Sequence, residues 1–285
     1  MVRLTDVVLR DGLQDEDVVV STDDKVDLAR AIAEAGVREL EVASFVSPRR
    51  IPQMADSADV VTRLRELLDV RLIGIALNGR GITRAADSDV DELRLVLSAT
   101  DGHSTANAGA TPTQLMSQYA DTLAHTHVTA EVSAAVSVAF TCPYDGGVEP
   151  GRVVDLVGGL RELGIARVSL ADTLGTASPG QVSATLVAVR EAYPELSIGL
   201  HLHDALGQAL ETVGEALALG VDQFDCSLGG IGGCPFAPGA HGNLDTRRLV
   251  DFLESAGYAT GVDPARLESA RGLLQRLLGR TLALR

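Results

Sequence analysis

Short aliphatic runs alternate with longer segments of helical period along this chain, and this alternation constrains the fold more than any other feature. We expect strands at residues 7–9, 40–43, 71–76, 93–97, 131–138, 168–171, 198–203 and 223–227. We expect helices from Ser21 or Thr22 onward and at 58–68, 81–86, 113–125, 153–162, 179–192, 205–218 and 245–256. Strands that alternate strictly with helices run parallel, and eight such units close into a barrel. The sequence therefore predicts an α/β fold, a (β/α)8 TIM barrel with a short C-terminal helical extension.

The length and composition fit one such barrel. A chain of 285 residues, 46% of them hydrophobic, can bury a large core, and α/β barrels often reach this size as one domain. We therefore expect residues 1–285 to form a single TIM-barrel domain, in which residues 258–285 add one or two helices packed against the barrel.

The charge and the cysteines limit the possible partners and compartments. A net charge of −15 argues against a nucleic-acid partner, because phosphate binding needs clustered Lys and Arg. No apolar run approaches the roughly 18 residues that span a bilayer, and the N-terminus lacks a signal-peptide pattern. Cys142, Cys226 and Cys234 are too scattered for a disulfide framework, so we expect free thiols. The expected protein is soluble and cytoplasmic, without a membrane partner.

Polar residues collect at the C-terminal ends of the predicted strands, where TIM barrels carry their active sites. They are Arg10 and Asp11 after the first strand, Glu41 in the second, Asn78 after the third, Asp172 after the sixth, and His201 and His203 in the seventh. A glycine-rich loop at 229–243 follows the eighth strand and contains Cys234 and Asn243. The fold would bring these distant residues to one mouth.

The two histidines suggest a metal site. Residues i and i+2 of a strand point to the same face, so the rings of His201 and His203 would project side by side. Two imidazoles, the carboxylate of Asp11 and the amide oxygen of Asn243 form a mixed nitrogen and oxygen ligand set for a divalent ion, Mg²⁺, Mn²⁺, Zn²⁺ or Co²⁺. The alternative is that both histidines are hydrogen-bonded core residues. Their position at a strand end, together with Arg10-Asp11 at another, favours the metal.

Four long motifs carry a resemblance to a known family. They are RDGLQ at 10–14, SFVSPRRIPQMAD at 44–56, HLHDALGQAL at 201–210 and GIGGCPFAPGAHGN at 230–243. In this order and spacing the chain resembles the 3-hydroxy-3-methylglutaryl-CoA lyases, from its first strand to residue 257. A wider superfamily of metal-dependent barrels, including isopropylmalate synthase, shares the RDG and HxH elements.

The resemblance implies a role for each motif residue. Asp11, His201, His203 and Asn243 would bind a divalent metal, and Arg10 would polarise the substrate thioester. Glu41 would orient Arg10 and neighbouring polar groups, Asp172 would lie by the substrate hydroxyl, and Cys234 would sit on a loop that closes over the site. Gln14 would support these residues from behind. We also expect Gln14, Asn78 and Arg49 to bind substrate, and Mg²⁺ or Mn²⁺ to be the metal. If they had no catalytic role, Glu41 and Asp172 would form structural ion pairs at the barrel rim, and Cys234 would be a small buried hydrophobic residue. Arg49 and Arg50 would either face the CoA phosphates or be solvated.

The implied reaction cleaves a small-molecule acyl-CoA substrate to acetyl-CoA and acetoacetate. Such a reaction would serve leucine degradation or ketone-body formation. The enzyme would be a homodimer or a higher homo-oligomer. Removal of the hydroxyl proton falls to Asp172 or to a metal ligand such as His201. Leu9, Asp101, Ala205, Leu206 and His241 depart from the family pattern and alter the walls around the ligands. A related 3-hydroxy-3-alkylglutaryl-CoA or another 3-hydroxyacyl-CoA is therefore an alternative substrate. Two further alternatives are condensation of acetyl-CoA with a 2-oxo acid, and a non-catalytic metal-binding or regulatory protein.

Overall fold

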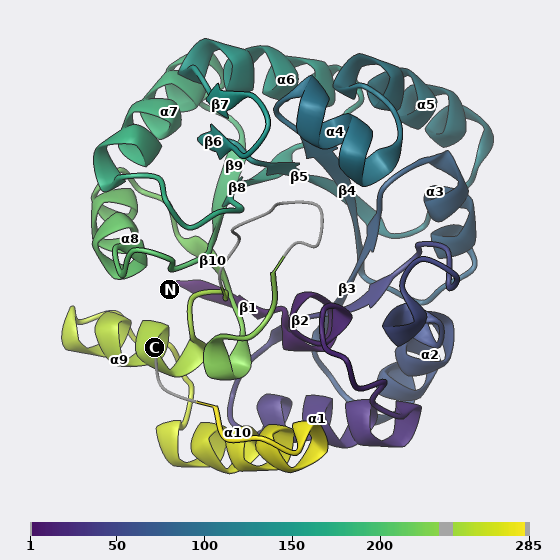
Figure 1. Cartoon of the computed structure of the whole chain (residues 1–285), viewed down its shortest axis with the longest axis vertical. Coiled ribbons are helices and arrows are strands. Elements are labelled where there is room, and N and C mark those ends of the chain that lie inside the picture. The colour runs from purple at the N-terminus through teal and green to yellow at the C-terminus, as the bar shows by residue number, and fades with distance from the viewer. Residues whose placement is uncertain (1, 234–241, 283–285) are drawn as a thin grey trace.

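A closed barrel of parallel strands forms the centre of the molecule (Figure 1). The computed structural model describes residues 2–233 and 242–282. In spatial order the strands are β1, β10, β9, β8, β5, β4, β3 and β2. Their bounds are β1 (Arg3–Asp6), β2 (Glu39–Ser44), β3 (Arg71–Ala76), β4 (Glu92–Ser98), β5 (Glu131–Ser137), β8 (Arg167–Asp172), β9 (Ser197–Leu202) and β10 (Gln223–Cys226). The predicted TIM barrel is confirmed.

Helices form a ring outside the strands (Figure 1). They are α1 (Thr22–Glu34), α2 (Ser57–Leu67), α3 (Gly79–Ala86), α4 (Asp101–Ala108), α5 (Pro112–His125), α6 (Pro150–Glu162), α7 (Pro179–Ala192), α8 (Ala209–Ala218), α9 (Thr246–Ser255) and α10 (Pro264–Leu278). Local chemistry sets several of their starts. Ser21 caps α1, and Ser178 and Gln181 form a reciprocal capping box at α7 with Pro179 at the first helical position.

The apolar core lies between strands and helices, while the inside of the barrel is largely polar. On β4, Leu93, Leu95 and Leu97 belong to the apolar core, whereas Glu92 and Arg94 are buried on the opposite face. The carboxylate of Glu92 accepts hydrogen bonds from Arg71 of β3 at 3.0 Å and from Arg167 of β8 at 2.9 Å. Ion-paired side chains therefore fill the barrel interior at this level, where many barrels have layers of aliphatic side chains.

The first strand ends earlier than predicted. We expected a strand at 7–9, but β1 stops at Asp6 and residues Val8–Gly12 form a single π-helical turn. The carboxylate of Asp6 accepts a hydrogen bond from the backbone N–H of Val8 at 2.9 Å, which bends the chain out of the sheet. Arg10 and Asp11 therefore lie on a helical turn rather than directly at a strand end.

Three other elements differ from the prediction. Helix α8 begins at Ala209, not at 205, because Asp204 accepts a hydrogen bond from the N–H of Ala209 and Gly207 takes a φ of +72°. Helix α4 and the two-stranded hairpin of β6 (Thr141–Cys142) and β7 (Gly146–Gly147) lie in segments where we predicted neither a helix nor a strand. They are short elements with few buried apolar residues, so no periodic pattern reveals them.

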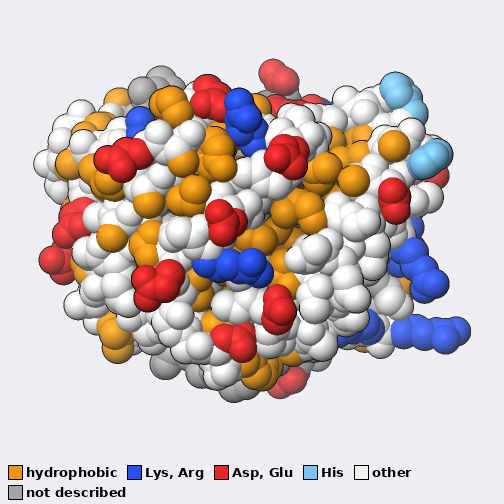
Figure 2. Space-filling view, turned by 90° about the horizontal axis from the view of Figure 1, so that it is seen from above, with side chains coloured by type: hydrophobic (Ala, Val, Ile, Leu, Met, Phe, Trp, Pro, Cys, Tyr) orange, Lys and Arg blue, Asp and Glu red, His pale blue; other side chains and the backbone are white. Residues whose placement is uncertain are grey.

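The predicted C-terminal extension is one helix, α10, which packs against α1. Leu267, Ala270 and Leu274 are buried in this contact region, and the N–H of Asp263 donates to the carbonyl of Ala35 at 2.7 Å. Within the described ranges no helix has the length and apolar character needed to cross a membrane. Figure 2 shows acidic side chains spread singly over one face of the molecule, in keeping with its negative net charge.

Candidate active site

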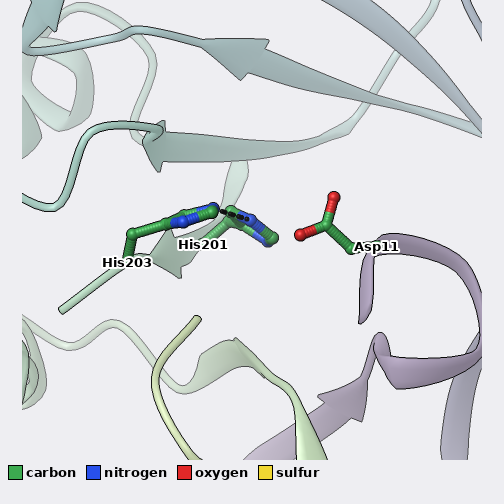
Figure 3. Close-up of side chains that lie close together, drawn as sticks. All are labelled: Asp11, His201 and His203. Carbon is green, nitrogen blue, oxygen red and sulfur yellow. Dashed lines mark hydrogen bonds between the residues drawn. The ribbon is translucent and has the colours of Figure 1, made fainter. Parts of the chain in front are cut away.

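Three predicted metal ligands meet at the C-terminal mouth of the barrel. Asp11 comes from the turn after β1, and His201 and His203 come from the end of β9, so their side chains face one another (Figure 3). One ligand atom from each lies within 4.8 Å of the other two, and all three residues are buried. The two Nε2 atoms are 3.2 Å apart. Two nitrogen ligands with bonds of about 2.1 Å at right angles around one ion are separated by about 3 Å.

A second set of residues fixes these ligands. His201 Nδ1 lies 3.2 Å from a carboxylate oxygen of Asp225, leaving Nε2 to face the cluster. Such a carboxylate behind the imidazole is the usual partner of a histidine that binds metal. The amide nitrogen of Asn243 donates to Asp11 at 2.6 Å and to the carbonyl of Ile231 at 3.0 Å. The structure thus places Asn243 beside the three ligands, in contact with Asp11.

The electrostatics of the cluster favour a cation. Burial acts to raise the pKa of Asp11, but the charges of Arg10, His201 and His203 outweigh it and hold this pKa below its ordinary value. Burial acts to lower the pKa of His201, but the hydrogen bond to Asp225 and the charge of Asp11 raise it above its ordinary value. Asp11 is thus held ionised and can act as an anionic ligand, and the carboxylates of Asp11 and Asp225 favour a positive charge at His201. The donor set and its field therefore fit a divalent metal ion.

Arg10 lies between Asp11 and Glu41. Its Nε donates to Glu41 at 2.6 Å, and its Nη1 donates to Asp11. Glu41 has no exposed side-chain surface, so the guanidinium is held from behind while it contributes to the wall of the cavity. The contact that the sequence resemblance implied between Glu41 and Arg10 is present in the structure.

A cavity of about 340 Å³ opens next to Arg10, Asp11, His201 and His203. Gln14 and Asn78 line it as expected, and the side chain of Asn78 also caps α3 by accepting a hydrogen bond from Gly81 N–H at 3.0 Å. Arg49 does not line it. The described basic residues of the wall are Arg10, Arg50, Arg80, Arg84 and Arg94.

One predicted catalytic residue, Asp172, stands apart from this cavity wall. The two carboxylate oxygens of Asp172 accept hydrogen bonds from the backbone N–H groups of Gly175 at 3.1 Å and Ala177 at 3.0 Å. Asp172 thus shapes the loop after β8, and the cavity wall is made by its neighbours Ala171 and Thr173. Cys234, like His241, lies outside the residues that the structure describes.

Sequence reasoning missed two charged residues of the site, Arg94 and Asp225. Both lie on the inner face of the barrel and both line the cavity. A signal exists for Arg94, because it is the one basic residue in the otherwise apolar run LRLVL at 93–97. Asp225 in QFDC gives a weaker signal, since an acidic residue near a strand end is common.

Comparison with known proteins agrees with this geometry. The HMGL-like family matches residues 1–274. The mouse protein named 3-hydroxy-3-methylglutaryl-CoA lyase, cytoplasmic, is 34% identical over 98% of this chain and 82% of its own length. The (R)-citramalyl-CoA lyase of Chloroflexus aurantiacus is 36% identical over 99% of this chain and 92% of its own.

A solved structure gives the same result at the level of the fold. The HMG-CoA lyase of Acinetobacter baumannii, in complex with coenzyme A and 3-methylmalate, superimposes with a TM-score of 0.94 and 36% identity, covering 99% of this chain and 92% of that one. Family match, sequence identity and fold agree over nearly the full length of the chain. The chain therefore belongs to the HMGL-like family, the family of 3-hydroxy-3-methylglutaryl-CoA lyases that its motifs predict.

Proposed function

We propose that the protein is a divalent-metal-dependent carbon–carbon lyase that cleaves a 3-hydroxy-3-methylglutaryl-CoA-type substrate into acetyl-CoA and a 3-oxo acid. The observation that carries this proposal is the cluster of Asp11, His201 and His203 beside Arg10 in one cavity. An ion bound there would act as a Lewis acid on the hydroxyl and carboxylate oxygens of the substrate.

Arg10 supplies the stabilisation of the developing charge. When the bond between C2 and C3 breaks, its electrons pass to the thioester as an enolate, and the hydroxyl oxygen loses its proton and becomes a carbonyl. A guanidinium already ion-paired with Glu41 and Asp11 needs little rearrangement to face that enolate oxygen. The enolate carbon then takes a proton, for which Cys234 remains the predicted donor.

The hydroxyl proton leaves through the metal-ligand side of the cavity in this proposal. Asp172 already accepts two backbone hydrogen bonds, whereas His201 and His203 line the cavity directly. We therefore favour the metal-ligand side of the cavity over Asp172 for the first proton acceptor; a histidine there would accept the proton only through a nitrogen that does not bind the ion. Asp172 then serves to position the loop after β8.

A second candidate substrate is a 3-hydroxyacyl-CoA with a different substituent at C3. Val96, Ala135 and Ala171 are small residues on three strands that line the cavity, so its wall is not moulded tightly around one methyl group. One relative is named as a (R)-citramalyl-CoA lyase, at an identity similar to that of the 3-hydroxy-3-methylglutaryl-CoA lyases.

We propose Mg²⁺ or Mn²⁺ as the native ion, the cytoplasm as the compartment, a homodimer or higher homo-oligomer as the assembly, and leucine degradation or ketone-body formation as the setting. Relatives named as cytoplasmic support the compartment, although others are named as mitochondrial.

The test is an assay for acetyl-CoA release from a panel of 3-hydroxyacyl-CoAs, including the 3-hydroxy-3-methylglutaryl and citramalyl esters. Chelator-treated protein should be inactive and recover with Mg²⁺ or Mn²⁺. His203→Ala should lose both turnover and tight metal binding, whereas His127→Ala, a matched change outside the site, should keep both. Full activity of His203→Ala in chelator would contradict the proposal.

A further inference from the structure

Arg94 crosses the inside of the barrel and contacts acidic residues on two other strands. It lies on β4, yet its Nη1 donates to Glu41 of β2 at 3.0 Å and to Asp225 of β10 at 2.8 Å. The residue is buried, with 6% of its surface exposed. One nitrogen atom therefore links the two strands on either side of β1.

These two carboxylates contact two different functional residues of the site, Arg10 and His201. Glu41 uses its other oxygen to bind Arg10, and Asp225 lies behind the imidazole of the metal ligand His201. Arg94 thus stands between the residue proposed to stabilise the enolate and a residue proposed to bind the metal.

Charge explains why this central position needs a cation. Two carboxylate oxygens within 3.0 Å of one nitrogen are necessarily close to each other, and buried like charges repel strongly at low dielectric. Without a cation between them, Glu41 and Asp225 would move apart. This movement would shift the group that each one orients.

We propose that Arg94 is a positioning residue that sets the spacing between Arg10 and the metal ligand His201 through Glu41 and Asp225. This proposal rests on the proposed function for its effect on turnover, but its effect on metal binding is independent of the substrate. Arg94 lines the cavity, but two carboxylates already neutralise its guanidinium, so it is poorly suited to bind a further anionic group of the substrate.

The experiment compares Arg94→Met and Arg94→Lys with Arg167→Met. Arg167 is a matched control, because it also points into the barrel and pairs with Glu92, but it contacts neither Glu41 nor Asp225. The dissociation constant for Mn²⁺ is measured by titration calorimetry on metal-free protein, and the visible spectrum of the Co²⁺-loaded protein reports ligand geometry. kcat and KM are measured separately with the best substrate of the panel.

Loss of groups that orient metal ligands typically costs 10- to 100-fold in metal affinity or activity, so Arg94→Met should weaken Mn²⁺ binding by about 10-fold and lower kcat by a similar factor. KM should change little, and the Co²⁺ spectrum should shift. Arg94→Lys should recover most of the loss, because a single nitrogen makes both contacts. Arg167→Met should leave the Mn²⁺ dissociation constant and the Co²⁺ spectrum unchanged.

The variant Asp225→Asn tests whether Arg94 acts on His201 through Asp225. If it does, the double variant Arg94→Met/Asp225→Asn should bind Mn²⁺ no more weakly than Asp225→Asn alone. Unchanged Mn²⁺ affinity and Co²⁺ spectrum in Arg94→Met, or a large rise in KM alone, would overturn the positioning role. If the wild type cleaves no acyl-CoA while Arg94→Met still weakens metal binding, the proposed function fails and the role of Arg94 stands.

Discussion

At the scale of single residues, Arg10 combines a buried ion pair with a position on the cavity wall. Burial acts to lower its pKa, but Asp11 and Glu41 raise it above the ordinary value, so the guanidinium stays charged throughout the reaction. A fixed charge of this kind acts mainly on the transition state, where the enolate develops.

Arg10→Met should therefore lower kcat by about 100- to 1,000-fold, as loss of other preorganised oxyanion donors does, and should change KM much less. Arg10→Lys should recover little, because its ammonium cannot pair with both Glu41 and the substrate oxygen through a planar fork. Steady-state kinetics with the best substrate test this. Arg80→Met, at the same cavity wall, should change KM more than kcat. The same pattern in Arg10→Met, a large change in KM with kcat intact, would make Arg10 a binding residue only.

The sequence predicts site residues that are related by local spacing, but not those that meet only through the packing of distant strands. His201 and His203 can be paired from their spacing, because the strand period of two places them side by side. Arg94 and Asp225 meet across the barrel from strands 131 residues apart, and no local pattern gives that register. The two backbone hydrogen bonds of Asp172 depend on the path of the following loop, so its placement also needed the structure.

At the scale of elements, Asp6 ties the end of β1 to two distant segments. Its carboxylate accepts hydrogen bonds from Val8 N–H at 2.9 Å, Leu228 N–H at 3.4 Å and the hydroxyl of Thr246 at 2.7 Å. Burial nevertheless raises its pKa from 3.8 to about 6, because the hydrogen bonds do not fully replace water.

This shift predicts a pH dependence of stability. The folded state holds the Asp6 proton more tightly than the unfolded state, so the contribution of Asp6 to stability is fully present below pH about 4 and is lost as the pH rises through about 6. Between pH 5 and 7 the loss should be about 1 kcal/mol. Asp6→Asn can keep all three contacts, since Thr246 can accept instead of donate, and should lack this loss. Urea unfolding of both proteins at several pH values measures it; equal pH slopes would show that Asp6 titrates normally.

Element boundaries were less predictable than element types. The apolar run at 7–9 looks like a buried strand because three aliphatic residues follow one another. All three are buried, but Val8 and Leu9 lie in a helical turn and Val7 precedes it. The start of α8 depends on Asp204 and Gly207, whose effect appears only once the chain path is known. The other seven barrel strands followed from the alternation of periods, since each has an apolar face that the helices cover.

At the scale of the whole molecule, Glu92 connects four strands inside the barrel. Besides Arg71 and Arg167, its carboxylate accepts a hydrogen bond from Ser133 of β5 at 2.6 Å and lies 3.6 Å from Arg94 Nε. Burial acts to raise its pKa, but these partners hold it below the ordinary value. Glu92 is thus an ionised group with no exposed surface.

Glu92→Gln should lower the free energy of unfolding by about 3–5 kcal/mol, because removing one partner of a buried ionic network leaves the others uncompensated. Urea denaturation at neutral pH measures the change. Glu195→Gln, which removes an exposed ion pair with Arg161, is the matched control and should leave the unfolding midpoint unchanged. Equal midpoints for all three proteins would mean that the interior network contributes nothing to stability.

The charged interior of the barrel also limits how such a sequence can evolve. An aliphatic layer tolerates one substitution at a time if the volume is kept, whereas each charge here has partners on other strands. A change at Glu41, Glu92, Arg94 or Asp225 is tolerable only with a second change that restores neutrality. Among homologues these positions should covary, and an arginine lost from one strand should reappear on a neighbouring one.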